Sequence, residues 1–130
     1  MPKIRRRVVS GMGDFSIWIE RLHEHYLRKT GMPLFPGTLN LQLEVPWFSP
    51  PGCLRLEGVE YGGTVTVNIV PCPVFGRQAF ILRTTANEEG RGHHPQTIIE
   101  IACDVKLRDT YQLRDGDWVE VEITDKRAMA

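Results

Sequence analysis

Apolar and polar residues alternate along most of this chain, and a period of two is typical of strands with one buried face. The clearest alternations run through residues 39–43, 65–69 and 119–123. Further strands are predicted at Ile4–Val9, Cys53–Val59, Gln78–Arg83 and Thr97–Cys103. Turn-forming Pro, Gly and Asp residues separate these segments. The pattern predicts a mainly β fold built from many short strands.

One segment, Ile17–Thr30, has helical periodicity instead. Its apolar residues recur at the spacing of an amphipathic helix of about four turns: Trp18, Ile19, Leu22, Tyr26 and Leu27. Gly31 is a natural stop signal, and Pro33 prevents continuation. Many short strands with one helix suggest a small barrel with the helix packed on it. The stretch from Asn87 to Pro95 is predicted to be an exposed, mobile loop.

Composition narrows the class of protein. The 130 residues fit a single domain spanning 1–130, with 42% apolar and 25% charged residues, as in soluble globular proteins. Sixteen basic and sixteen acidic residues give zero net charge, which argues against binding duplex DNA or an anionic membrane.

No apolar run approaches the ~18–20 residues of a membrane span. Three scattered cysteines fit a reducing cytoplasm. We expect a cytoplasmic protein without membrane or nucleic-acid partners. Its oligomeric state is open, with a monomer as the expectation.

A glycine-rich turn lies between the first predicted strand and the helix. Its sequence is Ser-Gly-Met-Gly-Asp at residues 10–14. Closely spaced glycines let backbone amides approach an anion, and a helix N-terminus favours negative charge. The turn is not a dinucleotide fingerprint, because Ser16 stands where a third glycine would fall, and the chain has no P-loop. A phosphate site and a plain tight turn both fit this pattern.

The segment Pro-Gly-Thr-Leu-Asn at residues 36–40 offers metal ligands. In an extended strand Thr38 and Asn40 project from one face, and Leu39 points the other way into the core. A hydroxyl and an amide carbonyl are hard oxygen ligands that suit Mg²⁺, and substrate phosphates would supply the missing negative charge. The alternative is the polar outer face of an ordinary strand.

Glu100 interrupts an apolar strand, Ile-Ile-Glu-Ile-Ala at residues 98–102. A carboxylate there is costly unless it is paired or near solvent, and apolar surroundings would raise its pKa towards that of a general base. The alternative is that Glu100 lies on the solvent-exposed face of an edge strand.

The segment Val-Lys-Leu-Arg at residues 105–108 carries two cations. They either bind phosphate or belong to a solvated turn. The histidines show no zinc-type spacing.

Taken together and in order, these motifs resemble the CTP-dependent riboflavin kinases best known from archaea. The most specific segments are residues 8–13, 36–41, 99–102, 106–108 and 113–119. The resemblance implies a six-stranded cradle-loop β-barrel, related to RIFT barrels, with one inserted helix. It also implies transfer of the terminal phosphoryl group of CTP to the ribityl 5′-hydroxyl of riboflavin, which gives FMN and CDP.

The resemblance further implies roles for individual residues. Thr38 and Asn40 would hold Mg²⁺. Glu100 would contact the flavin and act catalytically by orienting its hydroxyl, with deprotonation as a further role. Thr84, or its neighbour Thr85, would be the second flavin contact. The nucleotide would be bound by two segments: Gly11, Met12, Gly13, Asp14, Phe15 and Ser16, then Val105, Lys106, Leu107 and Arg108.

The chain departs from the family pattern at three places. Bulky Phe15 follows Asp14, the segment 85–95 is longer than usual, and Ala-Cys-Asp at residues 102–104 stands where the family tends to have Ala-Pro. Two other functions therefore stay open. One is a non-catalytic flavin- or nucleotide-binding or DNA-binding regulatory barrel, supported only by the basic run 5–7. The other is a kinase for another small alcohol. The preference for CTP over ATP rests wholly on the resemblance.

Overall fold

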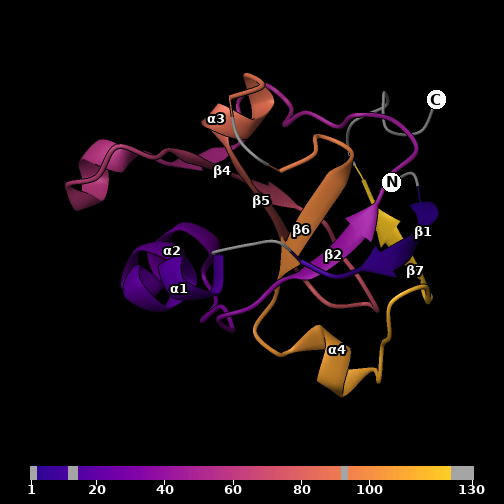
Figure 1. The fold of residues 1–130 in the computed structure, drawn as a ribbon. Coiled ribbons are helices and arrows are strands. Elements are labelled where there is room, and N and C mark those ends of the chain that lie inside the picture. Colours follow the sequence, from indigo (N-terminus) through magenta and orange to yellow (C-terminus); the bar gives the residue numbers. More distant parts are fainter. Residues whose placement is uncertain (1–2, 12–14, 92–93, 124–130) are drawn as a thin grey trace.

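The fold is built on one antiparallel sheet, shown in Figure 1. The structure, a computed structural model, describes residues 3–11, 15–91 and 94–123. Seven strands pair in the order β3-β4-β5-β6-β2-β1-β7. This confirms the mainly β class; six strands were expected, and the described residues form seven, of which β3 has only three residues. The strands are β1 Lys3–Val9, β2 Leu39–Gln42, β3 Leu54–Leu56, β4 Val67–Pro71, β5 Phe80–Thr84, β6 Ile98–Ala102 and β7 Trp118–Glu122.

The sheet curls back on itself. The segment after β4 meets β7, the strand at the far edge of the sheet, through an antiparallel bridge between Val74 and Val121. The Glu122 N–H also donates to the Pro73 carbonyl at 3.2 Å. These contacts partner an edge that would otherwise expose backbone groups, and they make the sheet barrel-like.

Each face of the sheet packs into its own apolar cluster. Leu39, Leu41, Ile81, Ile99 and Ile101 belong to the cluster inside the curled sheet. The second cluster lies on the outer face and combines strand residues with the helices; its members include Ile19, Tyr26, Phe80, Leu82 and Ala102. Because side chains alternate along a strand, positions 40 and 100 face the helix side.

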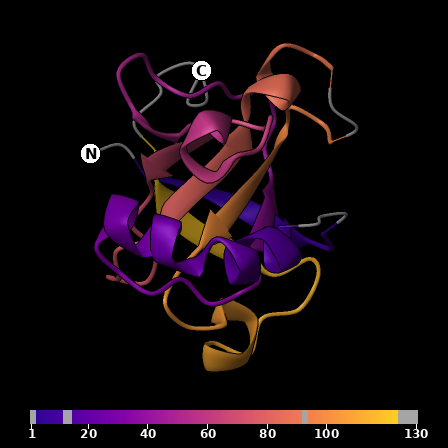
Figure 2. The same cartoon turned by 90° about the vertical axis from the view of Figure 1, so that its left-hand side faces the viewer.

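The predicted helix is present as two segments, α1 Phe15–Arg21 and α2 His23–Thr30, which cross the outer face of the sheet in Figure 2. They are interrupted only at Leu22, and the Tyr26 N–H still bonds the Leu22 carbonyl at 3.0 Å. The helix ends as predicted, with Gly31 left-handed at φ 77°. Of the expected apolar face, Ile19 and Tyr26 are buried, whereas Trp18 stays 40% exposed.

Three further one-turn helices were not predicted: η1 Gly58–Tyr61, α3 Thr85–Glu88 and α4 Leu107–Thr110. The prediction of an exposed loop from Asn87 is wrong at its start, because Asn87 lies in α3 and is buried. A single turn has no periodicity for a sequence pattern to reveal. No helix among the described residues is long and apolar enough to cross a membrane.

Candidate active site

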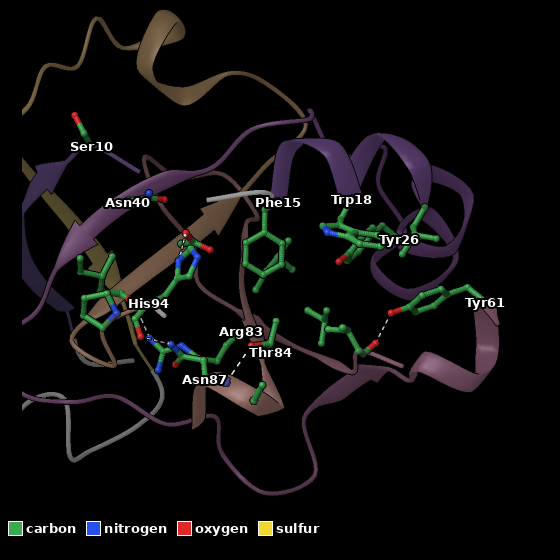
Figure 3. Close-up of a pocket in the computed structure, with 18 residues that line it drawn as sticks. Ser10, Phe15, Trp18, Tyr26, Asn40, Tyr61, Arg83, Thr84, Asn87 and His94 are labelled. Atoms are coloured by element: carbon green, nitrogen blue, oxygen red, sulfur yellow. Dashed lines mark hydrogen bonds and ion pairs between the residues drawn. The ribbon is translucent and has the colours of Figure 1, made fainter. Parts of the chain in front are cut away.

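A cavity of about 360 Å³ opens between the outer face of the sheet and the helices, as Figure 3 shows. One side is apolar and aromatic. Phe15, Trp18 and Tyr26 come from α1 and α2, and Tyr61 closes the same side from η1. The other side is polar and is formed by side chains of β2, β5 and β6 and of the segment around α3. The cavity therefore suits a flat, largely apolar ligand with a polar substituent.

The polar side unites residues that are far apart in the sequence. Asn40 and Glu100 are direct partners in the β2–β6 register, and only 3% and 6% of their surfaces are exposed. Both line the cavity, as does half-buried Thr84 at the end of β5. Thr85 begins α3 and does not line it. The sheet thus brings two predicted flavin contacts and one predicted metal ligand to a single site.

Two cationic or ionisable groups beside Glu100 were not predicted. The buried Arg83 guanidinium donates to the carbonyls of Trp47 and, at 2.6 Å, Ile98. Burial lowers the pKa of Arg83 to about 10, although nearby Glu88 and Glu100 oppose this shift, so the guanidinium remains protonated at neutral pH. His94 Nδ1 lies 3.4 Å from Glu100 Oε1. Both residues line the cavity, and neither has a local sequence signal, because the fold alone places them there.

Thr38 and Asn40 have the geometry of neighbouring metal ligands. The Thr38 hydroxyl donates to Asn40 Oδ1 at 2.8 Å. Adjacent oxygens around an octahedral Mg²⁺ with bonds of ~2.1 Å lie about 3 Å apart, so the two side chains fit this ion with little movement. In residues 3–11, 15–91 and 94–123, no group of three or more His, Cys, Asp or Glu side chains could hold a metal. The pair therefore needs further ligands, and phosphates would provide them.

A second hollow, of about 40 Å³, lies on the other side of this pair. Thr38 lines it together with residues 105–108. The side chains of Val105 and Leu107 pack against the core inside the sheet, whereas Lys106 extends to Asp109 at 3.7 Å and Arg108 to Asp115 at 2.5 Å. The cations of this segment are thus on the surface. The start of β2 lies between the two hollows, since Thr38, the residue before the strand, lines one hollow and Asn40 lines the other.

The predicted glycine-rich segment is only partly described. Gly11 and Ser16 are exposed, and Met12, Gly13 and Asp14 lie outside the described residues. Phe15, predicted with the nucleotide-binding residues, directs its ring into the large cavity (Figure 3). The aromatic residue that departs from the family pattern thus contributes to the wall of the large cavity.

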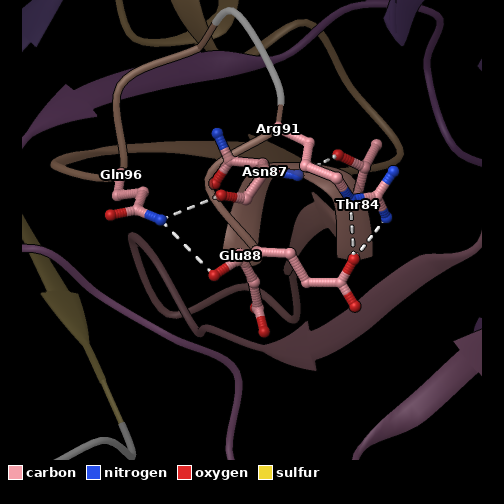
Figure 4. A network of polar contacts seen from close by, with 6 residues as sticks. Thr84, Asn87, Glu88, Arg91 and Gln96 are labelled. Carbon is pink, nitrogen blue, oxygen red and sulfur yellow. Dashed lines mark hydrogen bonds and ion pairs between the residues drawn. The ribbon is translucent and has the colours of Figure 1, made fainter.

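The segment around α3 forms one wall of the cavity and is held by polar contacts, of which Figure 4 shows those among Thr84, Asn87, Glu88 and Gln96. Thr84 Oγ1 accepts the Asn87 N–H at 3.1 Å and so caps α3. The Gln96 amide donates to the carbonyl of Asn87 at 3.0 Å, and Asn87 Nδ2 donates to the carbonyl of His94 at 2.6 Å. These bonds tie the chain on both sides of residues 92–93 to the end of β5.

Fold and site together define a small, mainly β domain with a ligand-sized cavity beside a neutral oxygen pair. Comparison with known sequences identifies the family to which this domain belongs. The family model CTP-dep_RFKase, described as "Domain of unknown function DUF120", matches residues 8–123. This chain therefore belongs to the CTP-dependent riboflavin kinase family.

Individual relatives carry the name "Riboflavin kinase". One from Pyrobaculum aerophilum is 37% identical over 131 residues, which cover 90% of this chain and 58% of that protein. One from Archaeoglobus fulgidus is 34% identical, covering 93% of this chain and 54% of the relative. A third, from Methanocella arvoryzae, is 31% identical, with 94% and 57% covered. The chain thus spans somewhat more than half the length of these curated relatives.

Proposed function

We propose that this chain is a riboflavin kinase that transfers the terminal phosphoryl group of CTP to the ribityl 5′-hydroxyl of riboflavin, releasing FMN and CDP with the help of Mg²⁺. One observation carries the proposal. Thr38, just before β2, lines a hollow together with the cation-bearing residues 105–108, and Asn40, in β2, lines a flavin-sized cavity together with Glu100. Family membership and the name of the relatives support the substrate pair.

The large cavity suits riboflavin in shape and polarity. Its volume of about 360 Å³ lies within the usual range of ligand pockets, roughly 300–1,000 Å³. The aromatic side, with Phe15, Trp18 and Tyr26, offers surfaces on which the isoalloxazine ring can pack. The ribityl chain would then extend towards Asn40 and Glu100, whose polar groups can bind its hydroxyls.

Phosphoryl transfer requires positioning and charge stabilisation more than covalent chemistry. Glu100 would accept a hydrogen bond from the ribityl 5′-hydroxyl and orient its oxygen towards the nucleotide, and it would also take up the proton. Lys106, Arg108 and the amides near Gly11 would bind the phosphates. Thr38 and Asn40 would hold Mg²⁺, which supplies neutralisation of phosphate charge when bound.

The test is a direct assay of the purified chain. Riboflavin and Mg²⁺ are incubated with CTP, ATP, GTP or UTP in turn, and FMN is separated by chromatography and measured by its fluorescence. We expect FMN, with an equal amount of CDP, when CTP is the donor. Equal rates with ATP would contradict the proposed donor. Binding of riboflavin and CTP without FMN formation would favour a regulatory barrel, and formation of no FMN with any donor would exclude the kinase.

A further inference from the structure

The turn between α4 and β7 is attached to the end of β1. Strands β1 and β7 pair with Arg7 opposite Trp118. Beyond that pair, the Gly116 N–H donates to the Val8 carbonyl and the Val8 N–H to the Asp117 carbonyl, both at 2.8 Å. These bonds fix the turn against the start of the glycine-rich segment, so that Asp115 lies beside Ser10.

The Asp115 carboxylate bonds to Arg108, in one segment proposed to hold the nucleotide, and to Ser10, the residue just before the other. Its Oδ2 accepts the Ser10 hydroxyl, and its Oδ1 accepts Arg108 Nη2 at 2.5 Å. The same Arg108 nitrogen donates to the Val9 carbonyl at 3.1 Å. The Ser10 hydroxyl, followed by the Arg108 guanidinium, holds the pKa of Asp115 below its usual range, so the carboxylate is charged at neutral pH.

We infer that Asp115 is a positioning residue that holds Ser10, directly after β1, and the Arg108 guanidinium in one arrangement for binding the nucleotide phosphates. The inference rests on the proposed function. Asp115 lies in segment 113–119, which resembles the family, and its proposed role differs from binding the metal or the flavin.

Charge alone predicts the opposite role for Asp115. A carboxylate near a phosphate site repels the phosphate, so removing it would strengthen nucleotide binding if electrostatics dominated. However, an Arg side chain is flexible, and a charge-assisted hydrogen bond at each end of the carboxylate restricts where both partners lie. Binding is stronger when such groups are already in place, because less freedom is lost on association. Removal of the Asp115 charge should therefore strengthen nucleotide binding if repulsion dominates, and weaken it if positioning dominates.

The experiment replaces Asp115 by Asn, which keeps the shape and removes the charge. We expect the KM for CTP and the Kd for CDP, measured by calorimetry, to rise about tenfold, a change of about 1.4 kcal/mol. Asp115 itself does not line the large cavity, but its partner Ser10 does. The KM for riboflavin should therefore rise less than the KM for CTP, and kcat at saturating CTP should stay within about twofold of the wild type.

Asp117→Asn is the matched control. It removes the same charge from the same turn, but the Asp117 carboxylate accepts only the Arg114 N–H, at 2.8 Å, among the side-chain bonds that the structure describes. We expect a lower Tm and an unchanged KM for CTP. In the Ser10→Ala background, Asp115→Asn should raise the KM for CTP by a smaller factor than it does in the wild type, because the two residues share a hydrogen bond.

The outcomes separate the inference from the proposed function. If the wild type forms FMN and Asp115→Asn leaves the KM for CTP unchanged or lowers it, the inference is overturned and the function stands. An equal rise in Asp117→Asn would also overturn it, because it would reflect general weakening of the turn. If the wild type neither binds CDP nor forms FMN, the proposed function and the inference fail together.

Discussion

Asn40 is almost completely buried, and its Oδ1 accepts the Thr38 hydroxyl within the protein. An isolated polar pair of this kind contributes little net stability, since the bond it makes on folding replaces bonds to water. Its position at the junction of two hollows is better explained by a ligand that both oxygens bind. Because the two side chains are already hydrogen-bonded to each other, neither oxygen has to be ordered when the ligand arrives.

We predict that Asn40→Ala lowers kcat at least about 100-fold, as is typical when a preorganised group that stabilises developing charge is lost. Circular dichroism should show an unchanged fold. The control is Asn68→Ala on β4, since Asn68 is 6% exposed and does not line the large cavity. It should lose a similar amount of stability and keep its kcat. Equal kcat values for wild type and Asn40→Ala would show that Asn40 is not a metal ligand.

At the scale of elements, the end of β5 and the start of α3 share one residue. Thr84 closes the strand, caps the helix by accepting the Asn87 N–H, and lines the cavity. Its oxygen is used by the cap, but its O–H is still available as a donor to a ligand. One side chain thus contributes both to the wall of the cavity and to the proposed flavin contact.

This double role can be separated by two substitutions. Thr84→Ala should reduce the free energy of unfolding by about 1 kcal/mol through loss of the cap and should weaken riboflavin binding, measured by quenching of its fluorescence. Thr84→Ser should retain both properties. Thr85→Ala is the control, because Thr85 lies one residue further and does not line the cavity. If Thr84→Ala and Thr85→Ala bind riboflavin equally, Thr84 is not a flavin contact.

The sequence could predict those elements in which apolar residues recur at a regular spacing. Alternation identified the strands around Leu41, Ile69 and Val121, and helical spacing with Gly31 located the end of α2. Glu100 could be singled out because a carboxylate in an apolar strand requires an explanation. Thr38 and Asn40 could be singled out because two hard oxygen ligands two residues apart share one face of a strand. Arg83 and His94 could not be, since their place beside Glu100 depends on strand register and on a loop held by Asn87. One-turn helices such as α3 have no pattern to detect.

For the whole molecule, zero net charge conceals an uneven local distribution. The proposed metal ligands, Thr38 and Asn40, are neutral, and the cations near the nucleotide hollow are Lys106 and Arg108, each already paired with a carboxylate. The two proposed ligands therefore bring no charge with which to hold a bare cation, and the neighbouring carboxylate of Glu100 already lies 3.4 Å from His94 Nδ1. Lys106 and Arg108 are likewise partly neutralised before a phosphate arrives. Metal and nucleotide should each bind weakly alone and strongly together.

This expectation gives a prediction about the stability of the entire fold. A ligand that binds only the folded state at 100 times its Kd stabilises by about 2.7 kcal/mol, which raises the Tm of a domain of this size by roughly 10 °C. We expect such a shift with CDP and Mg²⁺ together, a much smaller shift with CDP in EDTA, and none with Mg²⁺ alone. Asn40→Ala should remove the part that depends on Mg²⁺. A large shift with Mg²⁺ alone would mean that the protein holds the metal without phosphate. A CDP shift unaffected by EDTA would mean that the nucleotide binds without a metal, which would contradict the role proposed for Thr38 and Asn40.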